Sequence, residues 1–193
     1  MQSVCVFCGS SPGIDPAYAQ AARSLGRTLA EANVRLVFGG GHVGLMGVIS
    51  NAALEAGGEA IGIIPKSLVE RELAHPGLTD LRIVGSMHER KAMMSDLSEG
   101  FITLPGGTGT LEEFFEVLTW AQLGEHEKPC GLLNVAGYYD PLLAVFDQMV
   151  DEGFLSASNR ALVLVESEPD KLLRRLDLYR PPETPKWIDR SET

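Results

Sequence analysis

The sequence predicts an α/β protein with a Rossmann-like, doubly wound fold: a single domain whose mainly parallel sheet carries helices on both faces. Three observations lead to this prediction. Short apolar runs alternate along the chain with longer segments that carry apolar residues at helical spacing. The 193 residues, 45% of them hydrophobic, can build one substantial core. Glycine-rich turns follow several apolar runs, where open sheets bind their ligands.

The short apolar runs are the predicted strands, and the segments with helical spacing are the predicted helices. In chain order, the strands are residues 3–7, 35–38, 60–64, 81–84, 100–104, 131–135 and 162–165. The helices between and after them are residues 16–32, 44–56, 87–97, 110–123, 141–152 and 170–178. The strict alternation is typical of βαβ units, so parallel pairing is expected.

Local signals support several element boundaries. Asp15 and Asp140 each precede a proline and are predicted helix N-caps, while the pair at residues 57–58 is a glycine stop for a helix. Residues 66–80 form a long connection without strong periodicity, so a functional loop is expected there. Residues 1–178 are predicted as the single nucleotide-binding catalytic domain. Residues 179–193, rich in proline, are predicted as an extended tail that Trp187 can anchor.

Composition limits the partners of this protein. The formal net charge of -10 opposes binding to nucleic acid or to an anionic membrane surface. No apolar run approaches the about 20 residues needed to cross a bilayer, and the first residues lack the basic region of a signal peptide. A cytoplasmic protein is therefore expected.

The cysteines and histidines do not suggest a redox or metal site. Cys5 and Cys8 form a C-x-x-C pattern, but Cys5 lies inside an apolar run, which favours a small buried thiol over a redox role. Three cysteines suit a reducing compartment. The four histidines, at positions 42, 75, 88 and 126, show no paired spacing typical of metal ligands. We expect no metal.

Four segments leave the carboxyl ends of predicted strands and can face one crevice. They are residues 8–11, with Gly9 and Ser10; residues 39–44, with Gly40 and Gly41; the loop after residue 64; and residues 105–110. Residues 39–44 satisfy G-x-G-x-x-G, but no acidic residue ends the next strand, as a dinucleotide site requires. A tightly packed turn or a single-phosphate site is favoured over a redox cofactor.

The most informative segment joins a buried strand to a glycine-rich turn and an acidic helix start, at residues 104–113. Gly106, Gly107 and Gly109 leave backbone amides open to anionic oxygens. Thr110 and Glu113 fit a capping box, in which Glu113 reaches back to the cap residue's amide. Because Glu113 also stands beside exposed amides at a strand end, where ligands bind, direct action on a ligand is the alternative to capping.

Two cations stand near the start of the helix predicted at residues 87–97. Arg90 and Lys91 oppose the usual preference for acids at that end, which suggests that an anion compensates them. Arg90 can grip a phosphate or carboxylate with two parallel hydrogen bonds, and Lys91 adds a point charge. A surface ion pair with Glu89 or another acid is the alternative.

Residues 105–113, Pro-Gly-Gly-Thr-Gly-Thr-Leu-Glu-Glu, match P-G-G-x-G-T-x-x-E at every fixed position. The chain thereby resembles the LOG family, the cytokinin riboside 5'-monophosphate phosphoribohydrolases, and the likeness extends to residues 8–11, 39–47, 87–91, 119–120 and 137–139. The resemblance implies a catalytic pair, Arg90 and Glu113, a homodimer with sites near the subunit contact, and no cofactor. The nucleotide contacts it implies are Glu72, Arg90, Lys91, Gly106, Gly107, Thr108, Gly109, Thr110, Leu111, Glu112, Glu113 and Thr119.

The implied reaction is hydrolysis of the N-glycosidic bond of an adenine-type nucleoside 5'-monophosphate, such as a cytokinin riboside monophosphate or AMP, to free base and ribose 5-phosphate. A non-catalytic nucleotide carrier of the same fold is the alternative. Similar proteins are also labelled lysine decarboxylases, whose chemistry uses pyridoxal phosphate on a lysine. Lys91 is the only lysine in a suggestive place, and it matches a phosphate-binding position.

Overall fold

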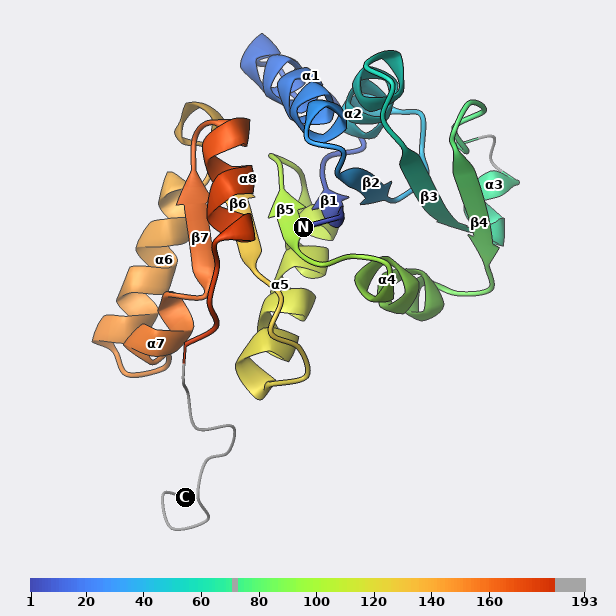
Figure 1. Cartoon of the computed structure of the whole chain (residues 1–193). Helices are drawn as coiled ribbons and strands as arrows, with labels where there is room; N and C mark the ends of the chain where they lie inside the picture. The colour runs from blue at the N-terminus through green and yellow to red at the C-terminus, as the bar shows by residue number, and fades with distance from the viewer. Residues whose placement is uncertain (71–72, 183–193) are drawn as a thin grey trace.

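The computed structural model describes residues 1–70 and 73–182, which form a seven-stranded parallel sheet flanked by helices (Figure 1). The strand order is β4-β3-β2-β1-β5-β6-β7, and every neighbouring pair is parallel. The strands are β1 (Ser3–Phe7), β2 (Arg35–Phe38), β3 (Ala60–Pro65), β4 (Asp80–Val84), β5 (Phe101–Thr103), β6 (Cys130–Leu133) and β7 (Val163–Glu166). The predicted doubly wound, parallel α/β fold is confirmed.

The helices cover both faces of this sheet. They are α1 (Pro16–Glu31), α2 (Gly44–Glu55), α3 (Lys66–Val69), α4 (Met87–Asp96), α5 (Thr108–Leu123), α6 (Asp140–Asp151), α7 (Ala157–Arg160) and α8 (Pro169–Asp177), with a short 3-10 turn, η1 (Val135–Gly137). One core layer contains residues of α1, α2 and α8, and the other contains residues of α4, α5 and α6.

Alternation along the central strands feeds these two layers. In β1, Val4 and Val6 pack into the layer with α1 and α2, whereas Cys5 and Phe7 pack into the layer with α5. All five residues of β1 are buried, as expected for a strand covered on both sides. The apolar runs therefore appear continuous in sequence although each face uses every second residue.

The order of the strands reverses at β1. The chain proceeds from β1 outward to β4, then returns to pair β5 on the other side of β1. The loops that leave β1 and β5 consequently diverge in opposite directions, which opens a crevice at the carboxyl ends of these two strands. This is the topological switch point, and it lies where residues 8–11 and 105–110 were expected to meet.

The predicted boundaries of most elements agree with the structure within two residues, and two of the three predicted helix-end signals are confirmed. Gly57, with a φ of 80°, directly follows the C-cap of α2, as the predicted glycine stop requires. Asp15 caps α1, accepting a hydrogen bond from the amide of Ala17 at 2.8 Å. The prediction for Asp140 is wrong, because α6 begins at Asp140 itself and its N-cap is Tyr139. The Asp140 carboxylate instead accepts from Asn134 Nδ2 at 2.7 Å, a contact that helix-capping patterns do not reveal.

Three short helical segments were not predicted: α3, η1 and α7. Helix α3 lies within the long connection after β3, whose residues 71–72 are outside the described part of the chain. Residues 183–193, including Trp187 of the predicted tail, are also outside it.

The three cysteines are free and buried, and burial raises the pKa of the Cys130 thiol to about 12. Among the described residues, no helix is long and apolar enough to span a membrane.

Candidate active site

A cavity of about 320 Å³ lies at the switch point. Three of the four segments that were expected to share a crevice contribute to it: the end of β1 and its loop, the turn after β2, and the start of α5, together with one face of α4. Its lining is Val6, Phe7, Cys8, Ser10, Gly39, Met46, Met87, Arg90, Met94, Gly107, Thr108, Gly109, Thr110, Glu112 and Glu113.

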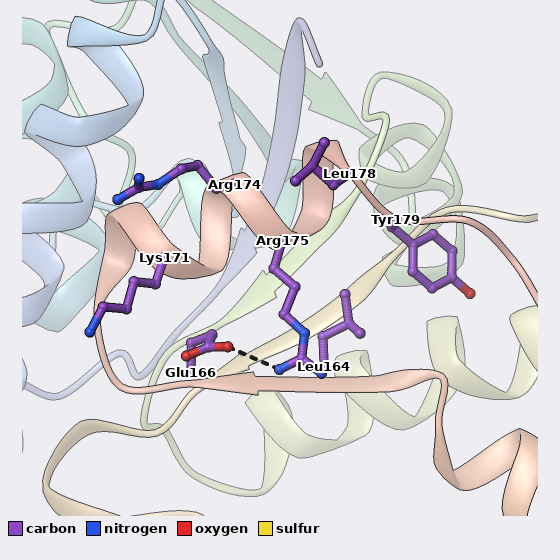
Figure 2. A pocket seen from close by; sticks show the side chains of 7 residues that line it. All are labelled: Leu164, Glu166, Lys171, Arg174, Arg175, Leu178 and Tyr179. Atoms are coloured by element: carbon purple, nitrogen blue, oxygen red, sulfur yellow. Dashed lines mark hydrogen bonds and ion pairs between the residues drawn. The ribbon is translucent and has the colours of Figure 1, made fainter.

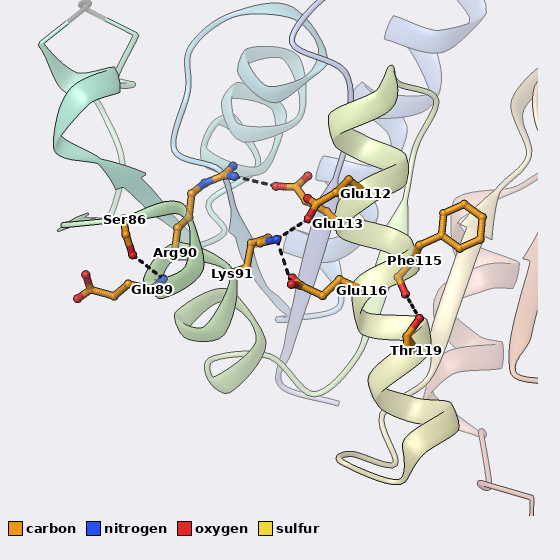
Figure 3. A network of polar contacts seen from close by, with 9 residues as sticks. All are labelled: Ser86, Glu89, Arg90, Lys91, Glu112, Glu113, Phe115, Glu116 and Thr119. Carbon is orange, nitrogen blue, oxygen red and sulfur yellow. Dashed lines mark hydrogen bonds and ion pairs between the residues drawn. The ribbon is translucent and has the colours of Figure 1, made fainter.

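Arg90 and Glu113 form a buried ion pair in this cavity. Arg90 Nη1 donates to Glu113 Oε1 at 2.8 Å, and the two side chains are only 10% and 11% exposed (Figure 3). Arg90 Nε also donates to the carbonyl oxygen of Ile63, in β3, at 3.1 Å. Two hydrogen bonds at separate nitrogens fix the plane of the guanidinium, and thereby the direction in which it meets the carboxylate.

Burial is the main influence on the charge of Glu113. It raises the pKa of the carboxyl above its ordinary value, and the Arg90 guanidinium opposes that rise. The pairing with Arg90 favours the carboxylate form of Glu113, and burial makes that carboxylate more basic than an exposed glutamate. That combination suits a group that acts on a proton or on developing positive charge.

The capping box predicted for Thr110 and Glu113 is wrong. Helix α5 begins two residues earlier, at Thr108, with Gly107 as its N-cap and no side chain bonded to the cap. Glu113 therefore stands beyond the first turn, and its side chain reaches across to α4 rather than back along its own helix. The tertiary attraction of Arg90 outweighs a local capping bond that sequence alone favours.

Lys91 does not line the cavity. Its side chain is 9% exposed, and its ammonium group donates to Glu112 at 2.5 Å and to Glu116 at 3.0 Å (Figure 3). The anions that compensate Arg90 and Lys91 in this structure are thus acids of α5, and these ion pairs link α4 to the first part of α5. The alternative partner Glu89 instead accepts from the amide of Gly85 at 2.8 Å.

The residues around Lys91 do not fit a pyridoxal phosphate site. Burial lowers the pKa of Lys91, but hydrogen bonds to Glu112 and Glu116 outweigh that effect and hold the pKa above its ordinary value. A lysine that forms a Schiff base needs an uncharged amine at working pH. None of the lysines in residues 1–70 and 73–182 lines the cavity.

The glycines at the start of α5 leave space in front of their backbone. A Cβ atom added at Gly107 or Gly109 would meet nothing within 4 Å, and neither residue has a positive φ. The folded protein therefore does not need glycine at these two positions for its own packing. At Gly106, by contrast, an added Cβ would stand 2.2 Å from Thr110 Oγ1, so this glycine serves the turn itself.

A second hollow adjoins the cavity on the other side of Gly107. Gly9 and Gly106 line it, and Ser10 and Gly107 line both spaces. Tyr138 closes its wall by donating to the carbonyl oxygen of Gly106 at 2.6 Å. Tyr18, which sequence reasoning did not single out, packs edge-on against Tyr138, and no local pattern marks such a contact.

Gly44 joins the turn after β2 to the loop after β1. It has a φ of 57°, and a Cβ there would lie 2.3 Å from the backbone of Ser10. Only glycine permits this approach. Gly40 and Gly41 do not line the cavity; Gly40 packs on β3 and Gly41 forms an isolated bridge with Ala74. The turn is thus a tightly packed one, and its member at the cavity is Gly39.

Two other predicted contacts, Leu111 and Thr119, lie elsewhere. Leu111 does not line the cavity, and Thr119 is exposed eleven residues into α5, where its hydroxyl donates to the carbonyl oxygen of Phe115 (Figure 3). Glu72 is outside the described residues. Met46, Met87 and Met94 line the cavity without having been predicted, since methionine at helical spacing is equally typical of a core.

A separate cavity of about 480 Å³ lies between β7 and α8 (Figure 2). It contains three cations, but each is paired with a carboxylate: Lys171 with Glu168, Arg174 with Asp170, and Arg175 with Glu166. Figure 2 shows Arg175 turned toward Glu166 at the base of the groove. The groove thus offers little net positive charge, unlike the amides at the start of α5.

The chain is similar to known proteins over most of its length. Residues 46–176 match the family model described as "Possible lysine decarboxylase". A probable cytokinin riboside 5'-monophosphate phosphoribohydrolase of Oryza sativa subsp. japonica is 52% identical, over 93% of this chain and 73% of the relative. A cytokinin riboside 5'-monophosphate phosphoribohydrolase of Rhodococcoides fascians is also 52% identical, over 85% of this chain and 83% of its own.

Solved structures show the same fold at lower identity. The molybdenum cofactor binding protein of Rippkaea orientalis aligns with a TM-score of 0.67 at 24% identity, over 92% of this chain and 96% of that chain. The molybdenum cofactor carrier protein of Chlamydomonas reinhardtii aligns equally well at 21% identity. At such identity the likeness concerns the fold alone. The high identity of the enzymes over most of the chain shows that this protein belongs to the LOG family, the cytokinin riboside 5'-monophosphate phosphoribohydrolases.

Proposed function

We propose that this protein hydrolyses the N-glycosidic bond of adenine-type nucleoside 5'-monophosphates, such as cytokinin riboside monophosphates or AMP, releasing the free base and ribose 5-phosphate. The observation that carries the proposal is the buried Arg90–Glu113 pair, which lines one cavity together with the open amino end of α5. A carboxylate and an anion site within one cavity are what a phosphorylated ribose requires.

Glu113 has two tasks in this reaction. Breaking the bond between C1′ and the base builds positive charge on the ribose, and the carboxylate stabilises that charge. The same group accepts a proton from the water that attacks C1′, so the oxygen of water becomes the new hydroxyl of ribose 5-phosphate. The base leaves with the electron pair of the broken C1′–N bond and takes up one proton, so the two products together contain the added water. Its raised pKa, caused by burial and limited by Arg90, makes the carboxylate a stronger base for this step.

Arg90 orients Glu113 in this proposal. Its two hydrogen bonds, to Glu113 and to the carbonyl oxygen of Ile63, hold the carboxylate at one place in the cavity. The phosphate binds the amides of Gly107, Thr108 and Gly109 at the amino end of α5, where the helix dipole favours negative charge. Thr110 and Glu112, which also line the cavity, complete the contacts that we propose there.

The remaining proposed contacts require residues that do not line this cavity. We also propose a homodimer; exposed apolar side chains on α5 and α6, among them Leu123 and Val145, are compatible with a subunit contact. Thr119 lies away from the cavity of its own chain, so in the proposed homodimer it would contact a nucleotide across the subunit interface. The free, buried cysteines suit the proposed cytoplasmic location.

The test is incubation of the purified protein with AMP and with isopentenyladenosine monophosphate, followed by measurement of free base and ribose 5-phosphate. Base release from either nucleotide supports the proposal, and the ratio of the two rates shows which base is preferred. Binding of both nucleotides without release would instead support the carrier alternative.

Replacement of the proposed base sharpens this test. Glu113→Gln keeps the size of the side chain and removes its charge, so nucleotide binding should persist while base release falls by at least about 100-fold. Wild-type turnover in this variant would remove Glu113 from the mechanism. Glu125→Gln, on an exposed residue after the end of α5, is a control for loss of one acid from the surface.

A further inference from the structure

Backbone hydrogen bonds join the connection between β3 and β4 to the glycine turn after β2. The amide of His42 donates to the carbonyl oxygen of Leu73 at 3.0 Å, and the amide of His75 donates to that of Gly40 at 2.9 Å. Gly41 and Ala74 form an isolated antiparallel bridge between the same segments. These backbone bonds make the turn and the end of the connection a single unit.

The side chain of His75 fixes this unit to helix α2. The amide of Gly77 donates to His75 Nδ1 at 3.1 Å, so Nδ1 carries no proton in this arrangement. The proton therefore sits on Nε2, which donates to Asn51 Oδ1 at 3.0 Å. His75 is only 7% exposed, and both of its ring nitrogens are occupied when the ring is neutral.

The fastened turn forms one wall of the cavity. Gly39 begins it, and a Cβ added at Gly39 would stand 2.1 Å from Arg90 Nη2, so the backbone of the turn lies directly against the guanidinium. Arg90 also bonds to Ile63, in the strand that leads into the same connection. The connection further contains Glu72, an implied nucleotide contact three residues before His75.

We propose that His75 is a positioning residue: in its neutral form it holds the end of the β3–β4 connection and the Gly39–Gly41 turn in the arrangement that the nucleotide site requires. The inference deepens the proposed function and rests on it for the identity of the substrate. In this proposal His75 does not contact the substrate; it acts through the turn beside Arg90.

Acid should disrupt the two hydrogen bonds of the His75 side chain. Protonation of Nδ1 removes the acceptor of the Gly77 amide, so the charged ring cannot keep both bonds. Burial lowers the pKa of His75, and the nearby His42 lowers it further. His42 faces the ring from the turn and the neutral Asn51 faces it from α2, while Glu70, Arg71 and Glu72 precede it on the connection.

The chain contains a matched control for this bonding pattern. His126 Nδ1 accepts from the amide of Lys128, also two residues later, at 3.1 Å, and Nε2 meets the carbonyl oxygen of Val117 at 2.9 Å. Burial lowers the pKa of His126 as well. His126 follows the far end of α5 and does not line the cavity, so it shares the chemistry of His75 without its position.

The experiment compares the wild-type chain with His75→Gln, His126→Gln and Asn51→Ala. KM and kcat for AMP are measured at pH 8 and pH 6, together with hydrogen exchange of the backbone amides. Glutamine can still donate to Asn51 but offers no acceptor in the place of Nδ1. We expect His75→Gln to raise KM about tenfold at pH 8 through misplacement of the site. KM of the wild type should rise on acidification, and that of the variant should respond less.

The outcomes separate positioning from simple stability. An equal rise of KM in His126→Gln, or an unchanged KM and pH profile in His75→Gln, would overturn the proposal. If His75→Gln does not fold, Asn51→Ala provides the test, because it removes the hydrogen-bond partner of His75 Nε2 at an exposed position of α2. An unchanged KM in Asn51→Ala would then count against the proposal.

Hydrogen exchange distinguishes a failure of this inference from a failure of the proposed function. If the wild type releases no base, the proposed function is wrong, yet the fastening can still be measured. Loss of protection at Gly77, His75 and His42 in His75→Gln, with Lys128 unchanged, supports it. Undiminished protection of these amides would refute it, whatever the turnover.

Discussion

Arg90 is held by groups from three parts of the chain. Glu113 of α5 and the carbonyl oxygen of Ile63 in β3 accept its hydrogen bonds, and Gly39 supplies the backbone against which Nη2 lies. No rotamer preference of arginine produces this orientation. The position of the guanidinium depends on the absence of a side chain at Gly39 as much as on the presence of its two acceptors.

Gly39→Ala is therefore expected to impair catalysis more than folding. The new Cβ would stand 2.1 Å from Nη2, and the guanidinium, at the end of a long side chain, would give way rather than the backbone. A displaced Arg90 no longer orients Glu113, so kcat for base release should fall about tenfold or more, while the melting temperature changes little. Steady-state kinetics and thermal unfolding measure the two effects.

A double-mutant cycle tests the route of this effect. In an Arg90→Ala background, the added methyl group at Gly39 no longer meets a guanidinium, and its remaining close neighbour is Met46 Sδ at 3.2 Å, so it should cause little further loss of kcat. Additive losses from the two substitutions would show that Gly39 acts on the site in another way.

At the scale of the element, the amino end of α5 is built to receive an anion. The helix has 16 residues, a glycine N-cap and no side chain bonded to that cap. Its first amides therefore lack the partner that most helices supply. The cavity lies in front of them, and Gly107 and Gly109 keep it open.

Gly109→Ala should separate stability from binding. Alanine favours a helix over glycine by up to about 1 kcal/mol, and its Cβ would meet no neighbour. The free energy of unfolding, measured in urea, should stay the same or rise. The same methyl group stands where the phosphate approaches, so KM for AMP should increase. Gly106→Ala is the contrast: its Cβ would collide with Thr110, and it should lower stability.

The start of α5 also shows what sequence can and cannot predict at this scale. The strand, the glycine turn and the helix were predicted at residues 100–123, because period and composition are local properties. The capping role of Glu113 was wrong, because its actual partner is 23 residues away on α4. A capping pattern contains no information on a partner contributed by another element.

At the scale of the molecule, the alternation of strands and helices was sufficient to predict a parallel, doubly wound sheet. The order of the strands is a different property: β1 pairs with β2 and β5, and only this order places the loops after β1 and β5 at one crevice. The candidate site was predicted through motif residues and the resemblance they carry. The positions of Tyr18 and Met46 beside the site depend on packing that no local pattern reveals, and so do the hydrogen bonds between the β3–β4 connection and the turn after β2.

The stability of the whole molecule should fall in mild acid, through two histidines. Burial lowers the pKa of His75 and of His126 below the ordinary 6.5, so the unfolded chain binds protons more readily than the folded one. Their contribution is complete above pH 6.5 and is lost as the pH falls through that value toward their folded pKa. The raised pKa of Glu113 acts in the opposite direction, because the folded protein takes up that proton more readily.

Urea unfolding at pH 7.5 and at pH 5.5 measures the balance of these effects. We expect a lower midpoint at pH 5.5 for the wild type, and a smaller difference between the two values in a chain with both His75→Gln and His126→Gln. Glu113→Gln removes the opposing effect, so its midpoint should fall more steeply with acid than that of the wild type. A pH dependence that is identical in the double histidine variant and in the wild type would mean that other groups govern acid unfolding, since these two neutral rings would then contribute nothing to it.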